Sequence, residues 1–173
     1  KPRFLVTGGS GFIGSNIVKE LLEADVFVRV LDNFKTGPKA NLDAVKEEMG
    51  NCAYDLDVLE GSLTDLETCK RAVEGIDYVL HQGAIPSVPK SVDFPSESNE
   101  ANVTGTLNIL LAARDAKVKK LVYAASSSAY GNSIELPKVE TIRPQPRSPY
   151  AAQKLMGEHY CSIFNELYGL PTV

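Results

Sequence analysis

The chain has 173 residues, of which 43 % are hydrophobic and 23 % are charged, and its formal net charge is −4 at pH 7. This length suits one domain with a buried core. The negative charge gives no electrostatic reason to expect binding to nucleic acid or to an anionic membrane. No apolar run approaches the roughly 20 residues that span a bilayer, and no signal-peptide pattern precedes the first strand, so we expect a cytoplasmic protein.

The cysteines give no sign of a metal site. Cys52, Cys69 and Cys161 lack the spacing of metal ligands, and the chain has only two histidines. Three thiols cannot all pair within one chain, which favours reduced cysteines in the cytoplasm. We therefore expect no zinc site.

The first predicted elements are a strand, a glycine-rich turn and a helix. An apolar run at residues 4–7 leads into Gly8-Gly9-Ser10-Gly11-Phe12-Ile13-Gly14, and apolar residues then recur at helical spacing as far as Leu22. Glycine lets the backbone turn tightly and approach a pyrophosphate, whose charge is held by amides at the helix N-terminus. The pattern predicts a dinucleotide-binding turn, with a glycine turn that binds nothing as the alternative.

A second apolar run, residues 26–31, ends at Asp32. This is the distance from the glycine turn at which a dinucleotide fingerprint places its acidic residue. A carboxylate there accepts hydrogen bonds from both ribose hydroxyls and repels a 2′-phosphate, which predicts NAD rather than NADP. Lys35 lies close by in the sequence but does not overturn this preference.

The rest of the chain alternates between strands and helices. We expect helices over residues 41–49, 66–74, 96–116 and 150–168, and strands over residues 54–59, 76–80 and 120–125, with a sixth strand beginning near residue 170. Proline-containing loops separate the strand at 76–80 from the helix at 96–116, and the strand at 120–125 from the last helix. This alternation predicts an α/β fold, a doubly wound parallel sheet with helices on both faces.

Polar or glycine residues follow five of the predicted strands. In open parallel sheets, ligands bind beyond the carboxyl ends of the strands. The residues at those ends are Gly8–Gly14, Asp32, Ser62-Leu63, Gly83-Ala84 and Ser126. Asn102 falls inside a predicted helix, where Asn has poor propensity. One interpretation is that its side chain fixes the cofactor loops or a water molecule. The other is that it is a polar residue that the helix tolerates. We interpret His81 as structural.

Tyr150 and Lys154 outline an acid/base catalyst. Residues four apart share one face of a helix and can meet. A free phenol titrates near pH ~10, so it is a poor base at neutral pH, and a nearby ammonium favours the phenolate. The spacing alone has little weight, because most such pairs are solvated helix surface. Ser126 at a neighbouring strand end makes the catalytic interpretation stronger.

At this point the chain resembles a known family, the extended short-chain dehydrogenase/reductases. Within it, the chain is most similar to the NAD-dependent epimerase/dehydratase group, especially UDP-glucose and UDP-N-acetylglucosamine 4-epimerases. The motifs that carry the resemblance are Thr7-Gly8-x-x-Gly11-x-x-Gly14, His81-Gln82-Gly83-Ala84, Asn102-Val103-x-Gly105-Thr106, Ser126-Ser127-Ser128-Ala129-Tyr130-Gly131 and Ser148-Pro149-Tyr150-x-x-x-Lys154.

The resemblance implies a role for each site residue. Tyr150 would remove the proton of the sugar 4-OH, Lys154 would bind the nicotinamide ribose, and Ser126 would hold the sugar oxygen and relay its proton. Ser87, Val88 and Ser128 would lie near the UDP-sugar substrate. The residues implied to bind NAD, besides Tyr150 and Lys154, are Gly8, Gly11, Phe12, Ile13, Gly14, Asp32, Asn33, Ser62, Leu63, Gly83, Ala84, Ile85 and Asn102.

The implied reaction is epimerisation at the sugar C4. NAD⁺ takes a hydride from C4, the 4-keto sugar turns over in the site, and hydride returns to the opposite face. The related 4,6-dehydratases carry a motif like Thr-Asp-Glu where this chain has Ser126-Ser127-Ser128, and decarboxylases also tend to place a Glu there. Because serines cannot replace a carboxyl group in acid/base work, the resemblance favours a 4-epimerase. Another enzyme of the group and a catalytically silent NAD-binding fragment are the alternatives.

Two departures from the family pattern affect these expectations. Gly61-Ser62-Leu63 stands where the family has Gly-Asp-hydrophobic, so the contact to the adenine amine is weaker, shorter or made through water. Residues 1–173 correspond to the NAD-binding Rossmann domain, without the family's smaller C-terminal substrate domain. The resemblance also implies a homodimer formed through helices near residues 97–115 and 150–168. Its candidate contact residues, which are equally well explained as core, are Leu107, Leu111, Leu155, Phe164 and Leu167.

Overall fold

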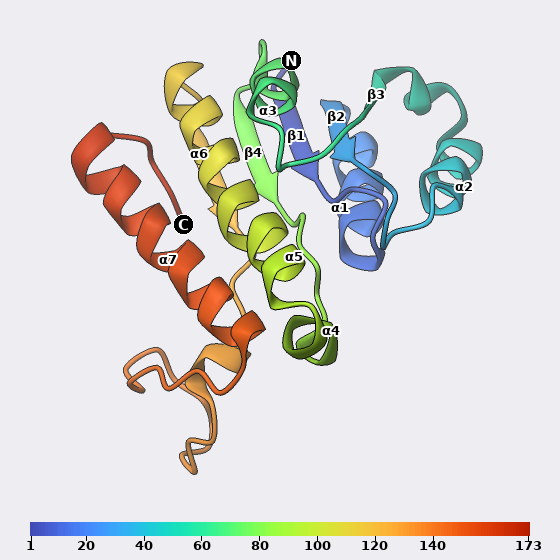
Figure 1. Ribbon diagram of the computed structural model, residues 1–173. Coiled ribbons are helices and arrows are strands. Elements are labelled where there is room, and N and C mark those ends of the chain that lie inside the picture. Colours follow the sequence, from blue (N-terminus) through green and yellow to red (C-terminus); the bar gives the residue numbers. More distant parts are fainter.

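A computed structural model describes all of residues 1–173 and contains one parallel sheet of five strands (Figure 1). The strand order is β3-β2-β1-β4-β5, so the chain winds in one direction from β1 to β3 and in the other from β4 onward. This is the doubly wound α/β fold predicted above. The strands are β1 (Arg3–Thr7), β2 (Phe27–Asp32), β3 (Leu56–Glu60), β4 (Tyr78–His81) and β5 (Lys120–Tyr123).

The register of the strands brings their carboxyl ends to one edge. Thr7, the last residue of β1, lies opposite Leu31 of β2 and His81 of β4, and His81 lies opposite Tyr123 of β5. The loops that follow these strands therefore leave the sheet side by side. The reversal of winding between β1 and β4 makes this edge the place where such sheets bind ligands.

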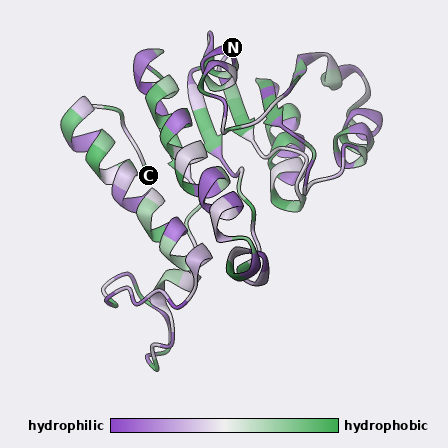
Figure 2. Cartoon of the chain, viewed as in Figure 1, coloured by the Kyte–Doolittle hydropathy of each residue, from purple (hydrophilic) through white to green (hydrophobic).

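Helices cover both faces of the sheet (Figure 1). The smaller core lies between the sheet and α1 (Phe12–Glu23) with α2 (Ala40–Met49). The larger core lies between the sheet and α3 (Leu66–Val73), α6 (Gly105–Asp115) and α7 (Pro149–Tyr168). Adjacent residues of β1 alternate between them, since Leu5 belongs to the larger core and Val6 to the smaller one. In Figure 2 the helices carry hydrophobic and hydrophilic residues together, as expected when one face packs on a sheet.

Two short elements differ from the sequence prediction. The strand expected from residue 54 begins at Leu56, because η1 (Gly50–Asp55) continues the chain after α2 as a 3₁₀ helix. The proline-containing loop before residue 96 contains a helix, α4 (Val88–Asp93). Ser87 caps it by accepting a hydrogen bond from the Lys90 amide, and Pro89 lies in its first turn, where a missing N–H costs nothing.

The long helix predicted at 96–116 is present, but it is not uniform. It consists of α5 (Pro95–Asn99), a π-helical turn η2 (Glu100–Thr104) and α6. Asn102 lies in the π-helical turn and is 2 % exposed. Single π-helical turns inside helices are frequent at functional sites, which draws attention to this position.

Beyond β5 the chain forms η3 (Ser127–Tyr130), a long loop and α7. Residues 171–173 then run parallel to β5, with hydrogen bonds from Leu121 N to Pro171 O and from Val173 N to Leu121 O. This confirms the start of the predicted sixth strand. No helix of the structure has the length and apolarity to cross a membrane. The three cysteines are unbonded, and no group of three or more His, Cys, Asp and Glu side chains is arranged to hold a metal ion.

A buried chain of hydrogen bonds ties the central strands to α6. Thr7 Oγ1 lies 2.6 Å from His81 Nδ1 and accepts the Gly83 amide at 3.0 Å. On the other side of the imidazole, Nε2 lies 3.0 Å from Thr106 Oγ1, which donates to the Asn102 carbonyl at 2.7 Å. Because Thr106 gives its proton to that carbonyl, it accepts one from Nε2, and Nδ1 then accepts from Thr7. Each group is satisfied by a neutral imidazole protonated on Nε2.

This arrangement predicts a pH dependence of stability. Burial, together with the positive charge of Lys154, lowers the pKa of His81 to about 3 from 6.5. At a pH between these two pKa values, His81 is protonated in the unfolded state but neutral in the folded state. The neutral imidazole therefore contributes its full stabilisation above about pH 6.5, and the protein loses this stabilisation as the pH falls. We expect the unfolding free energy to fall by up to about 1.4 kcal/mol per pH unit below that point.

Denaturant unfolding between about pH 5 and pH 7 measures this dependence. His81→Gln should be less stable than the wild type but flatter with pH, whereas His159→Gln, at an exposed position, should keep the wild-type slope. Equal slopes for the wild type and His81→Gln would contradict the assignment.

Gly14 permits the close contact between the glycine turn and α1. A Cβ at this position would collide with the carbonyl oxygen of Gly8 and lie 2.8 Å from the Gly9 Cα atom. At Gly11 the nearest atom would be the Gly8 oxygen at 3.3 Å, which a small shift relieves. The turn and the first turn of α1 therefore pack backbone to backbone at Gly14.

Alanine substitutions distinguish these two glycines. We expect Gly14→Ala to lower the unfolding free energy by about 1–3 kcal/mol, because backbone atoms must move. Gly11→Ala should cost less than about 1 kcal/mol, and denaturant midpoints at constant slope measure both. Equal losses in the two variants would mean that close packing at Gly14 is not the constraint.

Candidate active site and cofactor cleft

A cavity of about 380 Å³ opens at the carboxyl ends of β1 to β4. This volume lies in the range of small-molecule sites. The cavity collects the predicted cofactor residues of the glycine turn and of three further strand ends. Those that line it are Gly8, Gly11, Phe12, Ile13, Gly14, Asp32, Asn33, Ser62, Leu63, Gly83, Ala84 and Ile85.

The N-terminus of α1 leaves amides available at this cavity. Gly11 is the N-cap, and no side chain caps the helix there. The first turn of a helix has N–H groups without intrahelical partners, and together with the helix dipole they favour an anion. Gly11 and the first α1 residues, Phe12 to Gly14, line the cavity, so an anionic group bound there would meet these amides.

The carboxylate of Asp32 is held in place by two backbone amides. Its Oδ2 atom accepts from Ser10 N at 2.9 Å, and its Oδ1 atom accepts from Phe34 N at 2.8 Å. A carboxylate has about four acceptor positions, so each oxygen keeps one for a further donor. Asp32 therefore presents a fixed, negatively charged acceptor to the cavity.

Ser62 and Leu63 form a tight turn after β3. The Ser62 hydroxyl lies 2.8 Å from the Thr64 hydroxyl and accepts the Thr64 amide at 3.2 Å. The Leu63 carbonyl accepts from Asn108 Nδ2 at 2.9 Å, which ties the turn to α6. The hydroxyl of Ser62 reaches less far than the carboxylate of the family pattern and is already engaged in its own turn.

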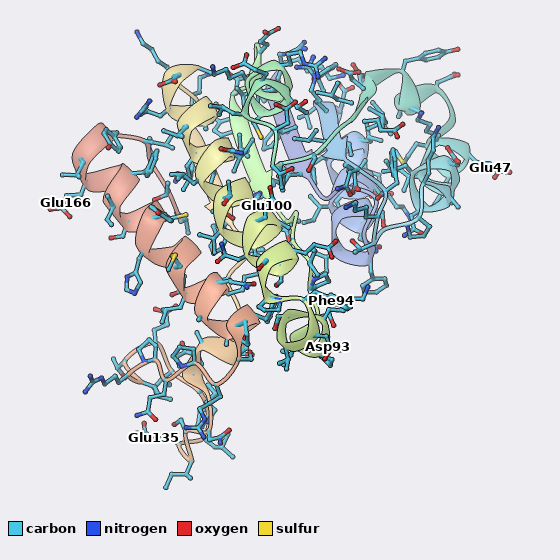
Figure 3. All side chains as sticks on the ribbon, viewed as in Figure 1. Glu47, Asp93, Phe94, Glu100, Glu135 and Glu166 are labelled. Carbon is cyan, nitrogen blue, oxygen red and sulfur yellow. The ribbon has the colours of Figure 1, made fainter.

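Sequence reasoning missed several residues of the cavity. Lys35, Thr36 and Gly37 come from the loop after β2, and Glu97, Glu100 and Ala101 come from α5 and η2. Lys35 Nζ and Glu97 Oε1 lie 3.8 Å apart, so a charge pair joins the two sides. The polar loop after Asp32 was a readable signal for the first group. The glutamates look like ordinary helix surface in the sequence; Glu100 is labelled in Figure 3 where α5 gives way to η2.

Asn102 holds the loop that follows β4. Its Oδ1 atom accepts from Ile85 N at 2.7 Å, and its Nδ2 atom donates to Ile85 O at 3.2 Å. The side chain thus pairs with the backbone of Ile85 as a neighbouring strand would. Asn102 does not line the cavity but fixes residues that do.

Lys154 is buried, at 5 % exposure, against the end of β5. Its Nζ atom donates to Ala124 O at 2.8 Å and lies 5.0 Å from the centre of the Tyr123 ring. Burial lowers the pKa of Lys154 to about 8, so the ammonium form still predominates at neutral pH. The site therefore holds a poorly solvated positive charge, which favours a negative charge on a neighbouring group.

The helix that carries Lys154 crosses β5 at close range. A Cβ at Gly157 would collide with the phenol of Tyr123, whose hydroxyl donates to the Lys154 carbonyl at 3.2 Å. Tyr150, in the first turn of α7, is half-buried, and its amide donates to Ser91 Oγ at 3.0 Å. The hydrogen bond from the Tyr123 hydroxyl fixes the first turns of α7 against β5, and the one from the Tyr150 amide fixes them against α4.

The serines after β5 lie at the same strand end as Lys154. Ser126 Oγ accepts from the Ser128 amide at 3.2 Å and lies 2.8 Å from Ser128 Oγ. Ser126 follows Ala124, the partner of Lys154, by two residues. Ser87 caps α4, and the adjacent Val88 is 41 % exposed. None of these residues lines the cavity, so the predicted catalytic and substrate residues lie outside the cleft that holds most of the predicted cofactor residues.

Nearly the whole chain is similar to known proteins. Residues 4–173 match the family described as the NAD dependent epimerase/dehydratase family. UDP-glucose 4-epimerase from Mycolicibacterium smegmatis is 37 % identical over 169 residues, which are 97 % of this chain and 53 % of that protein.

Solved structures share the fold throughout the chain. UDP-glucose 4-epimerase from Thermus thermophilus in complex with NAD has a TM-score of 0.87 and 39 % identity, over 98 % of this chain and 53 % of that one. A dTDP-glucose 4,6-dehydratase from Streptomyces venezuelae with NAD bound has a TM-score of 0.90 and 32 % identity, with the same coverage. The chain spans about half the length of these relatives. It belongs to the NAD dependent epimerase/dehydratase family.

Proposed function

We propose that this chain is the NAD-binding part of a nucleotide-sugar 4-epimerase that acts on a UDP-hexose or a UDP-N-acetylhexosamine. The observation that carries the proposal is the strand end after β5, where the buried ammonium of Lys154 lies beside a segment of three serines and no carboxyl group. Hydride chemistry at a carbinol needs a base for the hydroxyl proton, and Tyr150 with Lys154 meets that need.

Two features of the cleft suit NAD. The uncapped N-terminus of α1 offers amides to a pyrophosphate, and the close packing at Gly14 holds the glycine turn against that helix. Asp32 keeps free acceptor positions for two ribose hydroxyls and would repel a 2′-phosphate. The family itself is NAD dependent. We assign the adenosine and pyrophosphate to the residues that line the cavity and the nicotinamide to the region near Lys154.

The residues of this chain would handle the proton, while NAD, when bound, supplies hydride acceptance and return at the sugar C4. Tyr150 takes the proton of the 4-OH group as that carbon is oxidised and gives it back when the carbon is reduced. Lys154 stabilises the phenolate and binds the nicotinamide ribose. Ser126 holds the same sugar oxygen and relays its proton, and Ser87, Val88 and Ser128 line the sugar side.

The segment after β5 contains no carboxyl group, and this favours epimerisation over dehydration. Elimination of water from a sugar needs additional acid and base groups near the carbons that react. Ser126, Ser127 and Ser128 offer only hydroxyls there, and two of them hydrogen-bond to each other. Hydroxyl groups can hold and relay a proton but cannot replace a carboxyl acid at neutral pH.

Substitution of the proposed base tests the function in the full-length gene product that carries this chain. We expect Tyr150→Phe to retain NAD but to lose 4-epimerisation of UDP-galactose, UDP-glucose and their N-acetyl forms by about 10²–10⁴-fold, the usual contribution of a general base. Tyr168→Phe, at a half-exposed position of the same helix, is the matched control and should keep wild-type turnover.

The outcomes separate the alternatives. A Tyr150→Phe enzyme with turnover near the wild type would remove the assigned base. A wild-type protein that forms no 4-epimer from any of the four sugars would refute the epimerase proposal, and a 4-keto-6-deoxy product would indicate a dehydratase. Tight NAD binding without any product would support a silent NAD-binding module.

We also propose that α6 and α7 form a homodimer contact. Of the candidate residues, Phe164 is 3 % exposed and belongs to the core, whereas Leu107, Leu111 and Leu155 are half-buried and Leu167 is 68 % exposed. On α7, Met156 and Ile163 add apolar surface.

A cytoplasmic location likewise stays a prediction from the sequence.

Sedimentation velocity tests the dimer. A charged residue in an apolar contact costs several kcal/mol when unpaired, so Leu167→Lys should shift a dimer toward monomer. Glu166→Gln, at the adjacent exposed position, changes the net charge by the same one unit and is the control. A dimer that is unchanged in Leu167→Lys would place the contact elsewhere.

A further inference from the structure

Gln153 lies between Tyr150 and Lys154 in the sequence, yet it faces the protein interior. It is 5 % exposed. Its Oε1 atom accepts two hydrogen bonds, from Ser98 Oγ at 2.7 Å and from Asn102 Nδ2 at 2.9 Å. A glutamine on a catalytic helix therefore reaches the π-helical turn that fixes the cofactor loop.

The contact supports the orientation of the Asn102 amide that the Ile85 backbone also favours. The two ends of an Asn side chain have the same shape, so their orientation depends on their hydrogen-bond partners. Oδ1 faces the Ile85 amide, while Nδ2 faces the oxygens of Ile85, Gln153 and Ser98, of which Gln153 Oε1 is the closest. A flipped Asn102 would set its NH₂ group against the Ile85 N–H and its oxygen against Gln153 Oε1. Gln153 thus stabilises the orientation that holds Ile85.

We propose that Gln153 is a positioning residue that couples the cofactor loop, residues 83–85, to the first turns of α7. Through Asn102 it keeps that loop in a fixed place relative to Tyr150 and Lys154. The proposal deepens the proposed function and rests on it for its catalytic meaning. Its structural content, the effect of residue 153 on the loop, stands on the hydrogen bonds alone.

An apolar side chain at residue 153 should release this link. It would leave Asn102 Nδ2 without its shortest acceptor and Ser98 Oγ without the acceptor for its proton, in a site with little access to water. An unsatisfied buried donor is costly, so the opening of the Asn102–Ile85 pair becomes easier. Gln153→Met keeps a similar length without the oxygen. Gln153→Glu keeps an oxygen acceptor in either protonation state.

Residue-resolved hydrogen exchange on the full-length gene product without NAD is the first measurement. The Ile85 amide reports the Asn102 contact, and the Gly83 amide, which donates to Thr7 Oγ1 at 3.0 Å, is an internal reference in the same loop. In Gln153→Met we expect Ile85 to exchange about ten-fold faster relative to Gly83, as for one lost buried hydrogen bond. In Gln153→Glu the ratio should return toward the wild type.

NAD affinity by titration calorimetry is the second measurement. We expect the Kd to rise about ten-fold in Gln153→Met and to recover in Gln153→Glu. Gln153→Asn, one methylene too short to reach Asn102, should behave like Gln153→Met and replaces it if the Met variant does not fold. The inference rests on the ranking of NAD affinities, with Gln153→Glu close to the wild type and both Gln153→Met and Gln153→Asn weaker, rather than on the loss in one variant.

Two results would overturn the proposal. One is an unchanged Ile85:Gly83 exchange ratio and NAD Kd in Gln153→Met and Gln153→Asn, even with a lower melting temperature, because Gln153 would then act on stability alone. The other is a Gln153→Glu variant as impaired as Gln153→Met, because the oxygen acceptor would not be what matters. If the wild type forms no 4-epimer while the exchange and affinity effects appear, the proposed function fails and the coupling by Gln153 stands.

Discussion

A neutral, buried imidazole holds together the part of the molecule on which the cofactor cleft depends. His81 accepts from Thr7 and donates to Thr106, so it joins β1, β4 and α6 by hydrogen bonds of fixed direction. The loop after β4 is attached to this network twice, by the Gly83 amide on Thr7 and by the Ile85 backbone on Asn102. The side chains of Thr7 and Asn102 therefore hold this loop at two points. The shape of the cleft therefore depends on keeping that polar cluster dry and uncharged.

Much of the fold was predictable because its signals are local and periodic. Apolar runs of strand length alternate with apolar residues at helical spacing, and this alternation permits few sheet topologies. The prolines before residue 96 led to the wrong prediction of a loop, because Pro89 and Pro95 lie in the first turns of helices. The π-helical turn had no local signature. It depends on contacts distant in sequence, such as those of Asn102 with Ile85 and Gln153.

The candidate site was predictable to the extent that strand ends determine it. Glycines and polar residues that follow parallel strands must meet at one edge, so the glycine turn, Asp32 and the loop after β4 could be grouped from the sequence. Glu97 and Gln153 could not, since a charged or polar residue on a helix has many possible surroundings. Their roles depend on where α5 and α7 lie relative to the sheet, and the register that brings Gln153 to Asn102 is a property of packing.

Helix α7 crosses β5 at Gly157, where the lack of a side chain lets the Tyr123 ring pack against the helix backbone. Glycine inside a helix costs roughly 0.5–1 kcal/mol relative to alanine, a cost offset here by the Tyr123 ring and its hydrogen bond to Lys154 O. With a rise of 1.5 Å per residue, Lys154 lies about 4.5 Å from this point along the axis and Tyr168 about 16 Å. Beyond the crossing, Cys161 and Phe164 of α7 are buried in the larger core, so the helix is held against the sheet on both sides of Gly157. Because Lys154 lies within one turn of this crossing, its ammonium is held close to the point where α7 and β5 are in direct contact.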